Sequence, residues 1–189
     1  MPHKFDPTNK NLLLSTQRRI DLDPLRVIPL LPIMPHHVVA DIGCGPGYFT
    51  VPLGKYVYNG RVYALDIEQE MLDTAREEVS VVHLTNVDLI LNEETKLPLE
   101  KNSLDGAFAA FVAHEADDPE VMLGEILRCL RKGGWLALLE WYKRDMKEGP
   151  PKEDRIDQTE LRGLAQKIGF CYTSMHNLNS SQYMILMRK

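Results

Sequence analysis

The chain has 189 residues, a length that favours a single domain with its own hydrophobic core. Hydrophobic residues make up 44% of it and charged residues 26%, which excludes a disordered, collagen-like or coiled-coil chain. The formal net charge of −5 argues against a large basic face for nucleic acid, and no apolar run approaches the roughly 18 residues that span a membrane.

The first 35 residues are predicted to form an N-terminal cap segment ahead of a main domain at 36–189. They hold one helix-like stretch, 25–31, between Pro24 and Pro32. The N-terminus lacks the apolar core of a signal peptide, and the three cysteines are widely spaced, with no disulfide framework or metal signature. Both features lead us to expect a cytoplasmic protein.

Five short apolar runs follow one another along the chain, separated by helix-like segments. They span 38–41, 62–66, 87–91, 107–112 and 135–139. Such strands alternating with helices are typical of a parallel sheet covered on both faces. Two further strands, 171–177 and 182–187, are joined by a polar turn, so they are predicted to be antiparallel. The expected fold is α/β: a doubly wound, mostly parallel, seven-stranded sheet with a C-terminal antiparallel hairpin.

Two helices in the middle of the chain carry clear signals. Segment 69–79 places four apolar residues on one face: Met71, Leu72, Ala75 and Val79. Asp118 before Pro119 predicts the start of a second helix, which Gly133 and Gly134 are expected to end.

A third helix is predicted near the C-terminus. Asp157 and Glu160 resemble a capping box at its start, and Gly169 marks its end. The charged stretch 143–153, which precedes it, is predicted to be a loop or flap.

The segment Asp41–Gly47 carries the strongest chemical signal, because it holds three glycines between a strand and a helix-like stretch. Glycines let the backbone turn sharply and approach a ligand closely, and the following helix offers free N–H groups. The spacing Gly43-x-Gly45-x-Gly47 is one residue shorter than the G-x-G-x-x-G fingerprint of dinucleotide-binding proteins. An acid also stands two positions ahead of the first glycine. A nicotinamide-dependent oxidoreductase is therefore only a weak alternative.

Residues 38–47 resemble the first motif of class I S-adenosylmethionine (SAM)-dependent methyltransferases. In that family the glycine loop wraps the methionine part of SAM, and an acid lies near its ammonium group. The resemblance therefore assigns Asp41 to the ammonium group. It assigns the loop to the methionine part: Gly43, Cys44, Gly45 and Gly47. The alternative is a tight strand-to-helix turn without a ligand.

The second strand extends the resemblance. Asp66 ends this strand, where an acid can accept hydrogen bonds from the two ribose hydroxyls. The resemblance places Ile67 over the adenine and assigns Met71 to the same cofactor site. A solvated acid at a strand end is the alternative for Asp66.

Two later segments also match the family. Glu93 aligns with the acid that binds the adenine amino group, but the family more often has Asp-Ala here, so Glu93 and Glu94 could exchange roles. The backbone at Ala110 and Phe111 is expected to lie beside the methionine part.

The resemblance covers residues 36–142 closely and implies a Rossmann-like SAM methyltransferase fold. It is nearest to small methyltransferases of the ubiquinone/menaquinone-biosynthesis type, which act on many different small molecules. No Asn-Pro-Pro-aromatic run follows the fourth strand, as it does in many enzymes that methylate amino groups of nucleic-acid bases. A small-molecule acceptor is therefore expected rather than a nucleic acid, and the sequence leaves monomer and homodimer open.

Substrate-pocket candidates lie after the fourth and fifth strands. His114 is the histidine whose position suits a general base, with a helix-start or packing role as the alternative. Trp141 and Tyr142 either wall the pocket or pack in the core. No metal site is expected, because the histidine pair at 36–37 lacks a matching third ligand in sequence.

The sequence thus predicts methyl transfer from SAM to a small acceptor, with S-adenosylhomocysteine (SAH) as the product. Because the sulfonium is already activated, placement in a dry pocket is expected to supply most of the rate, with any base secondary. The alternative is a SAM-binding sensor or scaffold that no longer catalyses a reaction.

Overall fold

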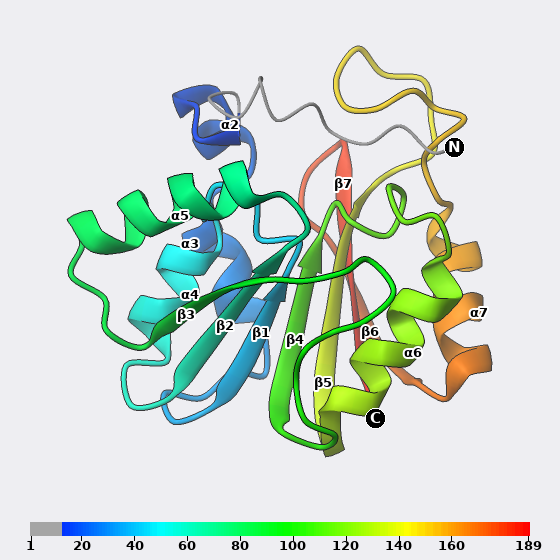
Figure 1. The fold of residues 1–189 in the computed structure, drawn as a ribbon. Coiled ribbons are helices and arrows are strands. Elements are labelled where there is room, and N and C mark those ends of the chain that lie inside the picture. Colours follow the sequence, from blue (N-terminus) through cyan, green and yellow to red (C-terminus); the bar gives the residue numbers. More distant parts are fainter. Residues whose placement is uncertain (1–12) are drawn as a thin grey trace.

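The computed structural model describes residues 13–189 and arranges seven strands in one sheet of order β3-β2-β1-β4-β5-β7-β6 (Figure 1). The strands are β1 Val38–Ile42, β2 Arg61–Asp66, β3 Val87–Leu91, β4 Leu104–Ala110, β5 Leu130–Trp141, β6 Cys171–Asn177 and β7 Gln182–Arg188. Strands β1 to β5 pair in parallel, while β7 is antiparallel to both β5 and β6. The predicted doubly wound α/β fold with a C-terminal antiparallel hairpin is confirmed.

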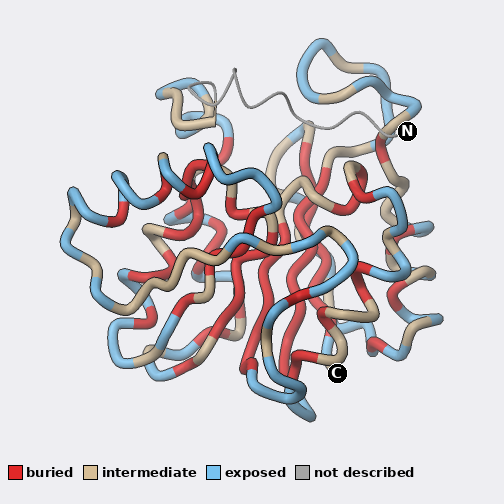
Figure 2. The backbone as a smooth tube through the Cα atoms, in the orientation of Figure 1, coloured by how far each residue is buried: buried red, intermediate tan, exposed pale blue. Residues whose placement is uncertain are grey.

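Helices cover both faces of the sheet. Their bounds are α2 Thr16–Asp21, α3 Pro24–Val27, η2 Ile28–Leu30, α4 Thr50–Tyr56, α5 Gln69–Val81, α6 Pro119–Cys129 and α7 Gln158–Ile168. Apolar residues of α6 and α7 form one core with the sheet, and those of α3, η2 and α4 form another. Burial is therefore continuous along the central strands and alternates along the helices (Figure 2).

Local sequence signals explain where several helices lie. The predicted apolar face of α5 is buried as expected: Met71, Leu72, Ala75 and Val79. The Asp118 side chain caps α6 by accepting the N–H groups of residues 120 and 121, and Pro119 occupies the first helical position. Asp157 caps α7 by accepting the N–H of Thr159.

The prediction that Gly133 and Gly134 end the helix before β5 is wrong. Helix α6 ends at Cys129, because Leu130 is already extended and pairs with Leu104 of β4. The glycine pair instead lies within the irregular first part of β5, where the β4–β5 register shifts.

The predicted bounds of the fourth strand, 107–112, are also wrong. Strand β4 begins at Leu104 and ends at Ala110, because Phe111 has a φ of +63° and leaves the extended conformation.

The N-terminal segment contains more helix than the single predicted stretch. The stretch 25–31 corresponds to the short helix α3 followed by one 3₁₀ turn, η2, and a further helix, α2, precedes them. No residue of α2 is buried, so its sequence has no apolar period to reveal it. Residues 1–12 of the predicted cap segment lie outside the described residues.

All five parallel strands end at the same edge of the sheet, at the top of Figure 1. The strand order reverses between β1 and β4, which opens a crevice at that edge. Helix α2 and the loop 143–153 lie at the same edge (Figure 1). This edge is therefore the place to search for a site.

Candidate active site

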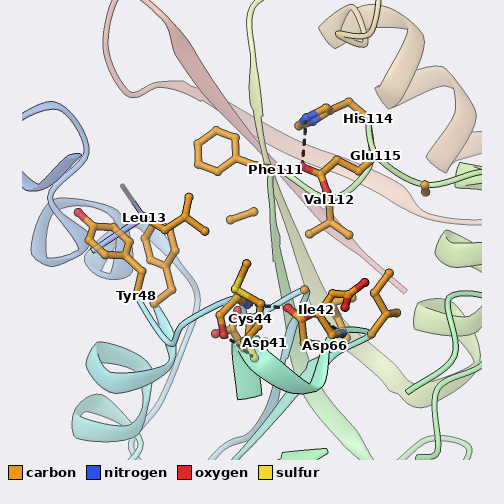
Figure 3. A pocket seen from close by; sticks show the side chains of 18 of the residues that line it. Leu13, Asp41, Ile42, Cys44, Tyr48, Asp66, Phe111, Val112, His114 and Glu115 are labelled. Atoms are coloured by element: carbon orange, nitrogen blue, oxygen red, sulfur yellow. Dashed lines mark hydrogen bonds and ion pairs between the residues drawn. The ribbon is translucent and has the colours of Figure 1, made fainter. Parts of the chain in front are cut away.

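A cavity of about 490 Å³ lies at the carboxyl edge of the sheet, within the range of pockets that hold small molecules. It is lined by the ends of β1, β2, β4 and β5, by α2 and by part of the loop 143–153. Figure 3 shows Asp41, Cys44 and Asp66 on one side of this space and Phe111 and His114 on the other.

The glycine loop forms the floor of the cavity. Gly43 and Gly45 have φ values of +62° and +53°, which L side chains rarely adopt. The loop is fixed by two hydrogen bonds, from the N–H of Cys44 to the carbonyl of Leu65 (2.9 Å) and from the N–H of Gly45 to Oδ2 of Asp66 (2.7 Å). The backbone at Gly45 is thus open to the cavity.

Gly47 lies away from the cavity, although the sequence grouped it with the other two glycines. A Cβ at this position would lie 3.3 Å from the Cα and the Cβ of Ala75 in α5. Its φ of +89° also favours glycine. Gly47 therefore allows close packing of the loop on α5 and does not line the cavity.

Asp41 is a buried carboxylate at the end of β1. The hydroxyl of Thr50 donates a hydrogen bond of 2.6 Å to its Oδ2. Burial raises the pKa of Asp41 to about 7, helped by the nearby Asp66 and opposed by the Thr50 hydrogen bond. Burial likewise raises the pKa of the Cys44 thiol well above its usual value, so this thiol stays neutral.

Asp66 is the second buried carboxylate, at the end of β2. It accepts the N–H of Gly45 at 2.7 Å and the N–H of Glu68 at 2.9 Å. Burial raises its pKa despite these hydrogen bonds. A ligand with hydroxyl or cationic groups would stabilise the ionised forms of both Asp41 and Asp66.

The region after β3 brings only one of the two candidate glutamates to the cavity. Glu94 lines it, together with Ile67 and Met71, whereas Glu93 does not. Glu93 pairs through its backbone with Lys96 and borders a separate shallow hollow. Of the two glutamates between which the sequence left the adenine-binding role open, only Glu94 lines the cavity.

Phe111 and Trp141 form an aromatic wall, with ring centroids 5.1 Å apart. The positive φ of Phe111 is a strained conformation for an aromatic residue, and such strain gathers at functional sites. Ala110 also lines the cavity. Tyr142 does not, because its ring packs on Tyr183 and its hydroxyl bonds Asn177 on the far side of β5.

His114 faces the cavity and is paired with Glu140, a buried carboxylate for which the sequence predicted no role. Nδ1 of the His114 ring lies 2.8 Å from Oε2 of Glu140, and the backbone N–H of His114 donates a hydrogen bond of 3.3 Å to Oε1 of the same carboxylate. Burial lowers the pKa of the imidazole, but the carboxylates of Glu140, Glu115 and Asp154 outweigh it, so the pKa is raised overall. The sequence signal for this pair was Glu140, an acidic residue within the otherwise apolar stretch 135–141.

A buried arginine holds the loop 143–153 beside the cavity. Arg155 donates to the carbonyls of Glu148 at 2.7 Å, Pro150 at 2.8 Å and Arg144 at 3.0 Å. Gly149 and Pro150 of this loop line the cavity. The sequence predicted the loop but not Arg155, since no local pattern distinguishes this arginine from the other basic residues.

Two further findings concern metal binding and membrane crossing. Within residues 13–189 no three His, Cys, Asp or Glu side chains gather in a way that could hold a metal ion. None of the described helices combines the length and apolar character that crossing a bilayer requires.

Comparison with known proteins identifies the class to which this fold and site belong. The model of a family described as "Methyltransferase domain" matches residues 40–138. A SAM-dependent methyltransferase structure from Aquifex aeolicus superimposes with a TM-score of 0.93 at 30% identity, covering 98% of this chain and 99% of that one. The chain belongs to the methyltransferase-domain family of class I SAM-dependent methyltransferases.

Other relatives match over a smaller part of their own length or share mainly the fold. A demethylmenaquinone methyltransferase of Bacillus mycoides is 27% identical over 138 residues, which are 72% of this chain and 57% of that protein. The chain spans between 33% and 57% of the length of three curated proteins that it matches. A structure of the [4+2]-cyclase SpnF shares the fold, with a TM-score of 0.80 at 19% identity over 93% of this chain and 82% of that one.

Proposed function

We propose that the protein transfers a methyl group from SAM to a small-molecule acceptor and releases SAH. The observation that carries this proposal is the shared cavity, which joins the glycine loop, the two carboxylates of Asp41 and Asp66 and the aromatic wall. The family membership supports it, and SAM use is inferred from the family rather than from a bound molecule.

The residues present fit the cofactor. Gly45 leaves open backbone on the cavity side, since a Cβ there would meet only Leu13, at 3.7 Å. Asp41 and Asp66 supply buried acceptors with raised pKa values, and a cationic or hydroxyl partner would stabilise their ionised forms. We assign Asp66 to the ribose hydroxyls, Asp41 to the ammonium group, and Ile67, Met71 and Glu94 to the adenine. Gly43, Cys44, Gly45, Ala110 and Phe111 would border the methionine part.

The cofactor, when bound, supplies an activated methyl group on a positively charged sulfur. This chain then has to hold the acceptor in line and exclude water. Phe111, Trp141 and the loop segment at Gly149 and Pro150 form the apolar surfaces that would do so. His114 lies where it could receive a proton from an acceptor that loses one, but its raised pKa makes it a poor base at neutral pH, so we propose that placement of the acceptor supplies most of the rate.

A small acceptor agrees with the size and partly aromatic lining of the cavity and with the relatives named demethylmenaquinone methyltransferase. The three cysteines are free thiols, which supports our proposal of a cytoplasmic protein. The alternative, a SAM-binding protein without methyl transfer, deserves its own test because the cyclase SpnF shares the fold.

Incubation with methyl-labelled SAM and fractionated cell extract tests the proposal. We expect label to move into a low-molecular-mass product only when active protein is present. Binding of SAM without transfer of label to any fraction would favour the sensor or scaffold.

SAM affinity is expected to fall as the pH drops below about 7. The free protein holds a proton on Asp41 below its pKa of about 7, and an ammonium group nearby requires the ionised carboxylate. The affinity should therefore decrease by up to about tenfold per pH unit between pH 7 and 5.5, with release of up to about one proton. Calorimetry in two buffers of different ionisation enthalpy measures this release. Asp41→Asn should remove most of this pH dependence and leave only the contribution of Asp66, whose pKa is also raised. An unchanged dependence in that variant would contradict the assignment.

His114→Ala is expected to slow methyl transfer by no more than about tenfold at neutral pH, with SAM affinity retained. The raised pKa keeps the imidazole protonated to higher pH, and a protonated imidazole cannot accept a proton. Rates with the identified acceptor, measured across pH beside a His176→Ala control, test this. A loss beyond about a hundredfold that shrinks as the pH rises would make His114 an essential base.

A further inference from the structure

Arg18 of α2 is the only lysine or arginine among the described residues that line the cavity. Its guanidinium carbon lies 4.9 Å from the ring centroid of Tyr48 and 5.3 Å from that of Phe111. Apart from the titratable His114, the other charged side chains of the lining are carboxylates: Asp41, Asp66, Glu68, Glu94, Glu115 and Glu125. Among the described residues of the lining, Arg18 is therefore the single permanent cation that a negatively charged group in the cavity would meet.

No carboxylate or carbonyl of the described residues accepts a hydrogen bond from the Arg18 guanidinium. Arg155 is different, since carbonyl oxygens of the loop accept from all of its guanidinium nitrogens. Burial lowers the pKa of Arg18 to about 10, so the side chain remains charged at neutral pH. Arg18 is partly buried, so its guanidinium bears part of the cost of desolvation without a matching anion among the described residues, and a bound anion would offset that cost.

The two aromatic rings hold the guanidinium in place. The hydroxyl of Tyr48 donates a hydrogen bond of 2.7 Å to the carbonyl of Leu22, which fixes its ring beside α2. Phe111 keeps its ring in the cavity through a strained backbone and a contact with Trp141. A guanidinium stacked in this way keeps the edge that can bind a carboxylate through two parallel hydrogen bonds.

We propose that Arg18 binds a carboxylate within this cavity, and that in the SAM-bound protein this is the carboxylate of the methionine part. The inference rests on the proposed function. Asp41, on the same cavity, is assigned to the ammonium group, so Arg18 supplies the opposite charge that an amino-acid zwitterion requires. A carboxylate on the methyl acceptor is the second source of the same chemistry.

Calorimetry with SAM and decarboxylated SAM tests this directly, because the two compounds differ only in that carboxylate. The wild-type protein should bind SAM about tenfold to a hundredfold more tightly than decarboxylated SAM. Arg18→Gln should lose this preference and still bind decarboxylated SAM like the wild type. Arg18→Lys, which keeps the charge without the fork, should retain part of the preference. Arg19→Gln, on the exposed side of α2, is the matched control and should behave like the wild type.

The remaining outcomes are distinct. If Arg18→Gln keeps the preference for SAM, acetate and benzoate are titrated into the SAH-saturated proteins. Binding that the wild type shows and the variant lacks would assign Arg18 to a carboxylate of the acceptor, and equal or absent binding would overturn the proposal. Equal weakening of SAM and decarboxylated SAM would also overturn it, since Arg18 would then act only on the fold. Failure of the wild type to bind SAM would contradict the proposed function itself.

Discussion

Gly45→Val is expected to abolish SAM binding, with a loss of affinity beyond about a hundredfold. Gly45 has a φ of +53°, which a β-branched residue adopts only with strain. A Cβ there would point into the cavity, where Leu13 is the nearest side chain at 3.7 Å, so the valine would occupy ligand space without a clash with its neighbours. Calorimetry with SAH measures the loss.

A matched control separates loss of the site from loss of the fold. Gly133 also has a positive φ, +77°, and a Cβ at this position would meet no atom within 4 Å. Gly133 lies near the start of β5, at the opposite edge of the sheet from the cavity. Gly133→Val should therefore lower the free energy of unfolding yet keep SAH binding. A folded Gly45→Val protein that still binds SAH would place the cofactor elsewhere.

Asp66→Ala is expected to weaken SAM binding by about tenfold to a hundredfold, because charge-assisted hydrogen bonds are worth about 1.5–3 kcal/mol. The carboxylate is buried and its pKa is raised, so its removal also relieves a desolvation cost in the free protein. The variant should consequently remain folded. Calorimetry measures the change in affinity.

Two further variants make the Asp66 result specific. Asp66→Asn keeps one of the two acceptor oxygens, which can serve the N–H of Gly45 or that of Glu68, so its loss of affinity should be smaller than that of Asp66→Ala. Asp88→Ala removes an exposed carboxylate of β3, paired with Arg61, and should leave SAM affinity unchanged. An unchanged dissociation constant for Asp66→Ala would mean that Asp66 only ends a strand.

The sequence predicted the parallel part of the sheet well because most of those strands are rich in apolar residues. Helix α5 was equally accessible, since its four buried residues recur at helical spacing. Helix α2 buries no residue and therefore left no periodic signal. The end of α6 was missed because Leu130 is apolar whether it continues the helix or pairs with Leu104 in the sheet.

The candidate site was predictable where one residue type has one structural task. Gly43, Gly45 and the acids near the ends of β1 and β2 belong to this group, whereas Gly47 packs on α5. The choice between Glu93 and Glu94 depends on which of the two residues lines the cavity once the backbone of Glu93 has paired with Lys96. Spacing in the sequence does not determine that. Glu140 and Arg18 reach the cavity only through tertiary packing, so neither was assigned from the sequence.

Direct titration of the protein with nucleotide cofactors tests the central claim, that this cavity is a SAM site. Calorimetry should show that SAM and SAH bind, each at one site per chain, and that NAD and NADP do not. The spacing of the loop glycines is one residue shorter than in dinucleotide-binding loops, which argues against a pyrophosphate. The carboxylates of Asp41 and Asp66 suit an ammonium group and a ribose. Tight binding of NAD or NADP without binding of SAM or SAH would contradict the account.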